Sequence, residues 1–398
     1  MNGITRKLMP AAIIALSTVG ATAVRADDGN RGNDDNRYVM TPLVSDVAGK
    51  ANVQDTNLKN AWGVAFTPAA SPFWISDNAT GLSTLYDGAG AIQSLVVTIP
   101  CPPTAGQGSS CPATAAPTGM VWNPTTSTAT GFLVPLTGKV ASFIWATEDG
   151  TISAWTGGLT SAVIAVNNAL NPNATLGAVY KGLVTGVNVN GVKVDSGTDF
   201  VFLYATNFRA GTVEVYAPAP TGSTTGFYVP VTTDGGFKDP KIPPGYAPFG
   251  IQNINGDLFV TYALQNAAKH DDVASPGNGF VDVFDTDGHL LRRFASRGAL
   301  NSPWGVARAS FAFGPFSGDI LVGNFGDGRI NVFGSDGDFL GQLRDTSGKP
   351  LMIDGLWTLT LGGGKNSSSD MLYFTAGPNG ETDGLFGTIT SVSSDDDD

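Results

Sequence analysis

NSPWGVARASFAFGPFSGDILVGNFGDGRINVFGSDGDFL, residues 301–340, is the stretch that decides the fold. A start motif, Pro303-Trp304-Gly305, opens a short apolar strand, and Asp336-Gly337 supplies the tight hairpin turn before the last strand. The predicted strands are residues 306–307, 319–323, 329–333 and 339–340. One such four-stranded sheet cannot bury both of its faces alone, so it has to stack against copies of itself.

The start motif recurs along the chain, about 50 to 70 residues apart, and each copy precedes a pair of β-branched and aromatic strands. Its copies are AWGVAF (61–66), PTGMVW (117–122), YKGLV (180–184), PFGIQ (248–252), PWGVA (303–307) and DGLWTL (354–359), aligned on Gly63, Gly119, Gly182, Gly250, Gly305 and Gly355. The strand pairs fall at 73–87, 143–155, 202–216, 258–285, 320–333 and 372–390. This pattern predicts an all-β protein, a six-bladed β-propeller.

The two ends of the propeller indicate how its ring closes. The sixth blade runs out of chain after Ile389, whereas residues 38–44 (YVMTPLV) form an apolar segment ahead of the first start motif. A closed ring removes the exposed sheet edges that an open one would carry. We therefore expect the N-terminal strand to complete the last blade, within a propeller that spans residues 38–391.

The first 26 residues have the composition of a secretory signal peptide. Arg6 and Lys7 precede a short apolar run, and Val24-Arg25-Ala26 is a small-x-small cleavage site ending at Ala26. A membrane anchor is the alternative, although the run is shorter than the roughly 20 residues of a span. We expect an exported chain, periplasmic or extracellular, with no membrane span after cleavage and with polar tails at 27–37 and 392–398.

Charge and cysteine content restrict the possible partners. The formal net charge is −12, and removal of residues 1–26 takes away three basic residues and no acidic one, which makes it −15. So acidic a chain is not expected to bind nucleic acid or an anionic membrane. Cys101 and Cys111 lie in one Pro/Gly/Ser-rich segment, and in an exported chain we expect them to form a disulfide.

Several long phrases resemble known families. The six-fold Pro-x-Gly pattern is similar to the NHL-repeat propellers. The phrases NAWGVAF, FWISDNATGLSTLYDG, ATNFRAGTVEVY, KHDDVASPGNGFVDVFD, RRFASRGALNSPWGVA, LVGNFGDGRINVF and GKPLMIDGLW resemble, in order, a bacterial family of exported propeller proteins that is defined by sequence. This resemblance covers roughly residues 38–390 and implies the propeller fold, but it brings no assigned activity.

In such propellers, the loop before each first strand and the loop between the second and third strands open on one face. This geometry predicts a mouth, which would receive a small molecule or a protein partner on a monomeric propeller. The plainer alternative is that the tryptophans fill space between blades and the asparagines cap turns. The candidate ligand-binding residues are Trp62, Asn78, Asn207, Arg209, Phe249, Lys269, His270, Asp272, Trp304, Asn324, Asp327 and Trp357.

The available side chains narrow the chemistry. With only His270 and His289 in the chain, a three-histidine metal site is impossible, and no G-x-S-x-G nucleophile motif occurs. The first hypothesis is therefore a non-enzymatic binding scaffold without a firm cofactor. The alternative is a calcium-dependent, lactonase-like hydrolase, in which mouth oxygens hold Ca²⁺ and His270 is the general base beside Asp271 or Asp272. Apolar first strands favour the scaffold; their inward residues are Val64, Ala65, Leu183, Ile251, Val306 and Ala307.

Overall fold

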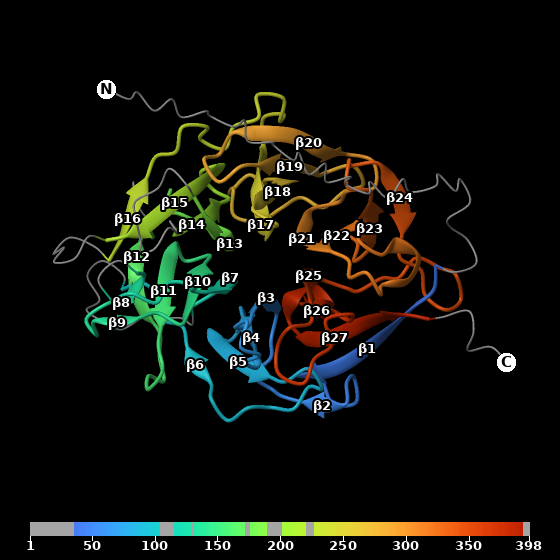
Figure 1. Ribbon diagram of the computed structural model, residues 1–398, viewed down its shortest axis with the longest axis horizontal. Helices are drawn as coiled ribbons and strands as arrows, with labels where there is room; N and C mark the ends of the chain where they lie inside the picture. The colour runs from blue at the N-terminus through green and yellow to red at the C-terminus, as the bar shows by residue number, and fades with distance from the viewer. Residues whose placement is uncertain are drawn as a thin grey trace, which may run out of the picture.

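In the computed structural model, six sheets of four or five strands, antiparallel except for one outermost pair, are arranged around a central axis, and one small two-stranded sheet is added to them (Figure 1). The structure describes residues 36–103, 115–128, 131–171, 176–188, 201–219 and 227–392, and the statements below concern these residues. The predicted six-bladed β-propeller is thereby confirmed. The predicted signal peptide and its cleavage at Ala26, residues 27–35, Cys111 and residues 393–398 lie outside the described residues, so the predicted disulfide stays a prediction.

The first three blades follow one another in chain order, each with its first strand nearest the axis. Blade one contains β3 (Ala61–Ala65), β4 (Phe73–Asp77), β5 (Leu82–Tyr86) and β6 (Val97–Thr98). Blade two contains β7 (Pro117–Trp122), β10 (Phe143–Thr147), β11 (Thr151–Trp155) and β12 (Val163–Asn167), with a small hairpin, β8 (Leu133–Val134) and β9 (Lys139–Val140), inserted. Blade three contains β13 (Tyr180–Val187), β14 (Val201–Asn207), β15 (Thr212–Pro218) and β16 (Tyr228–Val231).

The last three blades repeat this order, and blade six borrows its outer strand. Blade four contains β17 (Tyr246–Ile254), β18 (Asp257–Leu264), β19 (Phe280–Phe284) and β20 (Leu290–Ser296). Blade five contains β21 (Pro303–Arg308), β22 (Ile320–Asn324), β23 (Ile330–Phe333) and β24 (Phe339–Gln342), with the 3₁₀ turn η1 (Gly314–Phe316). Blade six contains β25 (Leu356–Leu361), β26 (Leu372–Ala376), β27 (Leu385–Ser391), β1 (Tyr38–Ser45) and β2 (Val53–Gln54), with the short helix α1 (Pro378–Glu381).

The N-terminal strand β1 lies antiparallel to the C-terminal strand β27, from Tyr38 opposite Ser391 to Ser45 opposite Leu385. Both termini of the described chain are therefore held in one sheet, as Figure 1 shows for the blue and red strands at its lower right. Asn36, just before β1, is buried and donates to the Gln342 carbonyl of blade five. That the ring depends on this strand stays a prediction, which is tested below.

Every first strand carries the same β-bulge, in which two residues face one residue of the second strand. In blade one the register moves from Ala61 opposite Asp77 to Val64 opposite Ile75. The corresponding shifts occur in the other five blades. The first bulge residue in each blade is Trp62, Thr118, Lys181, Phe249, Trp304 or Trp357, and the second is Gly63, Gly119, Gly182, Gly250, Gly305 or Thr358.

The bulge glycines are required because neighbouring first strands touch at the axis. A Cβ on Gly63 would lie 2.4 Å from the Thr118 carbonyl oxygen, and one on Gly119 would lie 2.4 Å from the Leu183 nitrogen. No side chain fits between backbones this close. The repeated glycine of the sequence is thus explained by close packing between blades.

The structure corrects the sixth member of this alignment. Thr358, not Gly355, occupies the bulge position, since a Cβ on Gly305 would meet the Trp357 oxygen at 2.4 Å and the Leu359 nitrogen at 2.9 Å. Gly355 lies three residues before Thr358, just ahead of β25, and has φ +65°, a turn conformation that favours glycine. The Thr358 hydroxyl instead donates to the Trp62 carbonyl of blade one at 2.7 Å and links the last blade to the first.

The core is divided into layers between adjacent blades. Between blades five and six, for example, Leu321 and Val332 pack with Leu356 and Phe374 in one buried cluster. Among the described residues, no helix has the length and apolar character that a membrane crossing requires. The layers fix the blades relative to one another, and hence the loops at the ends of the strands.

Candidate functional site

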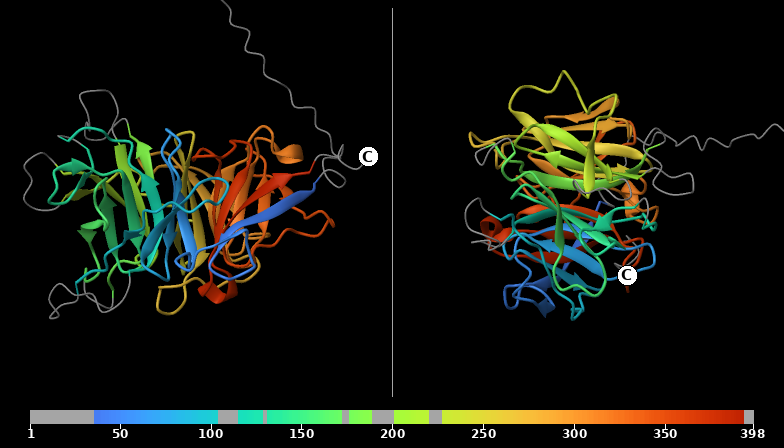
Figure 2. Two further views of the ribbon diagram at one scale, coloured as in Figure 1. Left: turned by 90° about the horizontal axis from the view of Figure 1, so that it is seen from below. Right: turned by 90° about the vertical axis from the view of Figure 1, so that its left-hand side faces the viewer.

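The loops before the first strands and the loops between second and third strands gather on one face, which we call the mouth face. The short helix α1 and the loop 265–279 both lie on it, at the lower edge of the left view in Figure 2. The six first bulge residues lie in a ring where this face meets the axis. Five of the six are uncharged, and the sixth is Lys181.

Aromatic side chains fill the middle of the mouth face. The Trp62 and Trp357 rings lie 3.9 Å apart between centroids, and Phe325 stacks on Trp357 at the same distance. We call this group the aromatic plug; it comprises Trp62, Phe208, Phe249, Trp304, Phe325 and Trp357. Phe325 is partly buried and the other five are buried. The predicted tryptophans and Phe249 are therefore brought together, but as packing within the ring and not as an exposed rim.

Of the residues that the structure describes, Lys181 is the one cation set into this plug. Its Nζ lies 5.0 Å from the ring centroid of Trp62 and 5.8 and 5.9 Å from those of Phe208 and Phe249. Its side chain is only 3% exposed and forms an ion pair with Glu148. A buried ammonium group is tolerated only when a carboxylate and π-faces compensate its lost hydration, and both are present.

Glu148, in the loop between β10 and β11, is the end of a hydrogen-bonded chain that crosses several blades. Its Oε2 accepts from Asn78 Nδ2 at 3.1 Å, and Asn60 Nδ2 donates to Asn78 Oδ1 at 3.1 Å and to Glu381 Oε2 at 2.8 Å. Trp357 Nε1 donates to Asn60 Oδ1 at 2.9 Å. Side chains from blades six, one, two and three are thereby fixed around Lys181.

A histidine and its neighbouring aspartate meet Glu148 from the loop after β18. His270 Nδ1 lies 2.6 Å from Asp271 Oδ1, and Asp271 Oδ1 lies 3.9 Å from Lys181 Nζ. One possible ligand atom from each of Glu148, His270 and Asp271 falls within 4.8 Å of the others. In one tautomer Nδ1–H donates to Asp271 and leaves the Nε2 lone pair for a proton, whereas in the other the Nδ1 lone pair faces the same space as the two carboxylates and can bind a metal with them.

At three other acids of the mouth face, burial outweighs the nearby positive charge and raises the pKa. Burial raises the pKa of Asp149 and of Glu381, and the charge of Glu148 raises both further. Burial also raises the pKa of Asp272, whose Oδ2 has no hydrogen-bond partner among the described residues. By contrast, the hydrogen bond from His270 lowers the pKa of Asp271. The mouth face therefore favours a cationic ligand over an anionic one.

Several predicted site residues make local structural contacts on the mouth face. Asn207 is buried and accepts from the Val179 and Ala210 backbone nitrogens, and Arg209 donates to the Gly177 carbonyl at 2.8 Å. Asn324 donates to Asp327 Oδ1 at 3.0 Å within its own loop. These four residues lie on the expected face but do not join the Glu148 cluster. Lys269, beside His270, is exposed.

The most informative residues of the site were not among the sequence candidates. Lys181, Glu148, Asp149, Asn60 and Glu381 join or surround the cluster. A signal for Lys181 was present, since YKGLV aligned with AWGVA places it opposite Trp62. No comparable signal exists for Glu381, which reaches the site from the short helix α1 of blade six.

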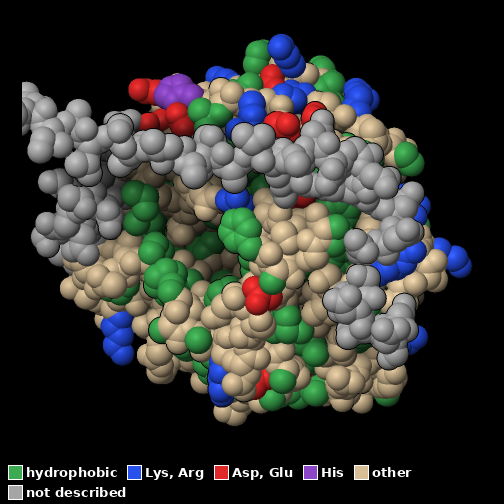
Figure 3. Space-filling view, turned by 45° about the vertical axis from the view of Figure 1, so that its right-hand side comes forward, with side chains coloured by type: hydrophobic (Ala, Val, Ile, Leu, Met, Phe, Trp, Pro, Cys, Tyr) green, Lys and Arg blue, Asp and Glu red, His purple; other side chains and the backbone are tan. Residues whose placement is uncertain are grey.

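The end of the axis opposite the mouth face is lined by uncharged side chains. A channel of about 50 Å³ opens between the first strands there, and no charged side chain lines it. Figure 3 shows the face seen in Figure 1 at an angle, with a hollow whose wall carries hydrophobic side chains. The lining includes Val64, Met120, Leu183, Ile251, Val306 and Leu359. Such a wall offers no carboxylate to a metal ion, so the ionisable chemistry of the axis is confined to the mouth face.

Comparison with known proteins places the chain beside viral relatives. No protein-family model matches it. "Uncharacterized protein R648" of Acanthamoeba polyphaga mimivirus is 31% identical over 354 residues, which are 87% of this chain and 78% of that protein. "Uncharacterized protein L690" of the same virus is 40% identical over 161 residues, 40% of this chain and 41% of that one.

Solved propellers match over most of the chain at low identity. The gluconolactonase XC5397 from Xanthomonas campestris is 14% identical with a TM-score of 0.45, over 84% of this chain and 87% of that one. The virginiamycin B lyase from Staphylococcus aureus is 12% identical with a TM-score of 0.46, over 89% of this chain and 100% of that one. Identities at this level concern the fold alone.

Proposed function

The chain belongs to the family of the mimivirus R648 protein, and we propose that it is a binding propeller whose mouth face holds a divalent cation through Glu148, His270 and Asp271. A small molecule or a protein segment with oxygen donors would complete the coordination of the cation. The protein would act as a monomer outside the cytoplasm, where the predicted signal peptide would direct it. Its activity would then be recognition and not turnover.

One observation carries this proposal: two carboxylates and an imidazole from two separate loops converge within 4.8 Å. The Asp272 carboxylate beside them has an oxygen without a partner among the described residues. Carboxylates suit Ca²⁺, Mn²⁺ and Zn²⁺ alike, whereas an imidazole ligand favours Zn²⁺ over Ca²⁺. The donor set therefore supports a Zn²⁺-like ion more strongly than the Ca²⁺ that the sequence led us to consider.

Metal-assisted hydrolysis is the second candidate, and the His270–Asp271 pair favours it. Asp271 orients the imidazole through Nδ1, so that Nε2 would accept a proton from an attacking water. A bound cation would supply polarisation of the substrate carbonyl. A lactone or an ester is the substrate class that this chemistry suits.

The test is metal analysis of protein purified without chelator, followed by calorimetric titration with Zn²⁺, Mn²⁺ and Ca²⁺. We expect one ion per chain, with a Kd at least tenfold weaker in Glu148→Gln and in His270→Ala. His289→Ala is the matched control, because His289 Nδ1 also lies near an aspartate, 3.0 Å from Asp285 Oδ2, on the opposite face.

Two outcomes would contradict the proposal. One is the absence of metal in the purified protein together with no binding heat for any of the three ions. The other is an equal loss of affinity in His289→Ala. Hydrolysis of a panel of lactones and esters that is chelator-sensitive and lost in His270→Ala would select the second candidate over the first.

A further inference from the structure

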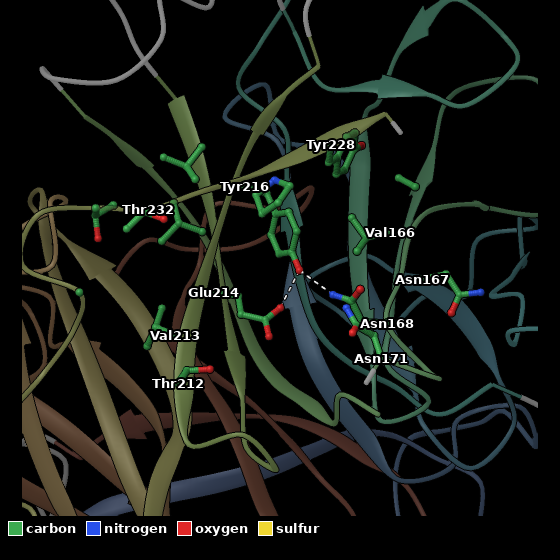
Figure 4. Close-up of a pocket in the computed structure, with 16 residues that line it drawn as sticks. Val166, Asn167, Asn168, Asn171, Thr212, Val213, Glu214, Tyr216, Tyr228 and Thr232 are labelled. Carbon is green, nitrogen blue, oxygen red and sulfur yellow. Dashed lines mark hydrogen bonds between the residues drawn. The ribbon is translucent and has the colours of Figure 1, made fainter. Parts of the chain in front are cut away.

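A groove lies on the outer side of the ring, between blades two and three, away from the mouth cluster. Its volume is about 590 Å³, within the range of small-molecule sites. Strand β12 of blade two forms one wall, and β15 and β16 of blade three form the other (Figure 4). The lining residues used below are Val166, Asn168, Thr212, Val213, Glu214 and Tyr216.

The groove exists because the outer strand of blade three is short. Strand β16 pairs with β15 only from Val215 opposite Val231 to Pro218 opposite Tyr228. Residues 212–214 of β15 therefore have no outer strand beside them, and Thr232 and Thr233 lead the chain away along the rim. The side chain of Glu214 lies where this outer strand is missing, as Figure 4 shows.

The carboxylate of Glu214 is the centre of a hydrogen-bond network in the groove. Glu214 Oε2 accepts from Tyr180 OH at 2.5 Å and from Tyr216 OH at 2.6 Å, and Oε1 accepts from Asn207 Nδ2 at 2.7 Å. Three of the roughly four acceptor positions of this carboxylate are thus used, which leaves one on Oε1. Asn168 Nδ2 donates to both tyrosine oxygens, at 2.8 and 3.0 Å.

The groove also carries one uncompensated charge. Glu214 is the only charged residue in its lining, and its three partners are all neutral. Among the described residues, no Lys, Arg or His forms an ion pair with it. A half-buried carboxylate without a counter-ion attracts a cation, and its remaining lone pair requires a donor.

We propose that this groove binds a primary ammonium group carried on an aliphatic chain. The ammonium would donate to Glu214 Oε1 and to Asn168 Oδ1, to which no described residue donates. The aliphatic chain would lie against Val166 and Val213. An anionic ligand is disfavoured by Glu214. A neutral alcohol could donate the same hydrogen bond but would leave the carboxylate uncompensated.

The experiment is calorimetric titration of the full-length protein at pH 7 with hexylammonium, 1-hexanol and hexanoate. We expect hexylammonium to bind at least tenfold more tightly than 1-hexanol, and hexanoate not to bind. Added 0.5 M NaCl should weaken the hexylammonium binding, because the attraction is partly between charges. A parallel titration with Nα-acetyl-lysine methylamide separates the two sources of the ammonium, a free amine or a lysine side chain of a polypeptide.

Two variants locate the site. Glu214→Gln should weaken hexylammonium binding at least tenfold. Thr212→Trp, at an exposed position on the rim, should block the groove without removing any hydrogen-bond donor to Glu214, which keeps the test valid even if the first variant folds poorly. Glu148→Gln, in the mouth, should leave this binding unchanged. Equal affinity for hexylammonium and 1-hexanol, or unchanged binding in Thr212→Trp, would overturn the proposal.

Discussion

The two faces of the ring each present one histidine paired with an aspartate, and their surroundings differ. On the mouth face, His270 Nδ1 lies 2.6 Å from Asp271 Oδ1, and this pair, 36% and 60% exposed, lies next to a buried lysine and Glu148. On the opposite face, His289 Nδ1 lies 3.0 Å from Asp285 Oδ2, and both side chains are more than one third exposed. Asp285 Oδ1 there accepts from the Asp287 and His289 backbone nitrogens, as in an ordinary turn.

The comparison teaches that a His–Asp pair indicates a site only through its neighbours. Around His289 the other carboxylate oxygen of Asp285 closes a hairpin, and no buried charged group lies in an ion pair with either side chain among the described residues. Around His270 the neighbours are acids whose pKa values burial has raised, and one ammonium group that holds Glu148 in place. The pair itself is exposed on both faces, so the buried charged neighbours make the mouth-face pair different, because electrostatic interactions strengthen where water is excluded.

The largest effect should come from opening the ring, since both faces depend on it. A deletion of residues 27–45 removes all of β1 and exposes the edge of β27 in blade six. We expect aggregation or loss of cooperative unfolding, because an unpaired edge strand pairs with other chains. Size-exclusion chromatography and thermal unfolding measure this. Deletion of 27–35 is the control, and equal behaviour of the two truncations would show that β1 does not close the ring.

A smaller effect, confined to one face, is expected from Lys181→Met. The substitution leaves Glu148 beside the aromatic plug without its cation, which should lower the free energy of unfolding by about 3 kcal/mol. Urea denaturation measures it. Lys59→Met, which breaks the more exposed ion pair with Asp46, should cost under about 1 kcal/mol.

The double variant Lys181→Met/Glu148→Gln sharpens this test. Removing both charges should restore part of the lost stability, since the unpaired carboxylate is the main cost. If Lys181→Met lowers the free energy of unfolding by less than about 0.5 kcal/mol, then water hydrates Glu148 in the variant, and the contrast between the two faces disappears.

Much of the fold could be predicted from the sequence, because the repeat is enforced by local rules. Strands favour alternating β-branched residues, tight hairpins favour Asp-Gly, and five of the six axial bulges hold glycine, so the motif around Gly305 indicates a whole blade. Gly355 shows where the rule fails. A glycine that supplies a positive φ cannot be told from one that supplies space, and Thr358 held the position that the pattern assigned to Gly355.

The site was harder to predict, because it is assembled across blades. Lys181 lies in an apolar strand, where a lysine ordinarily points to solvent, and the residues that make its burial possible are Glu148 and Trp62 from two other blades. Nothing in the sequence gives the distance between those blades. The asparagines were ambiguous for a similar reason: Asn78 joins the site, whereas Asn324 caps its own loop.

The smallest effect concerns the pH dependence of stability. Burial raises the pKa of Asp272, so the folded protein holds more protons than the unfolded chain between the ordinary pKa, about 4, and the raised value. The free energy of unfolding therefore falls as the pH rises through this window. Asp271 acts in the opposite sense, because its lowered pKa contributes stability that is lost only in acid.

Asp272→Asn should remove the penalty, and its effect should depend on pH. We expect a gain of about 1 kcal/mol at pH 7 that shrinks towards zero near pH 3, where Asp272 is protonated in both states. Asp257→Asn is the control: this acid lies in the β17–β18 hairpin of the opposite face, and its carboxylate accepts no hydrogen bond from the described residues. Urea denaturation at both pH values measures the difference. A gain of the same size at pH 3 and pH 7, or an equal gain in the control, would show that the acids of the mouth are no more constrained than those of the other face.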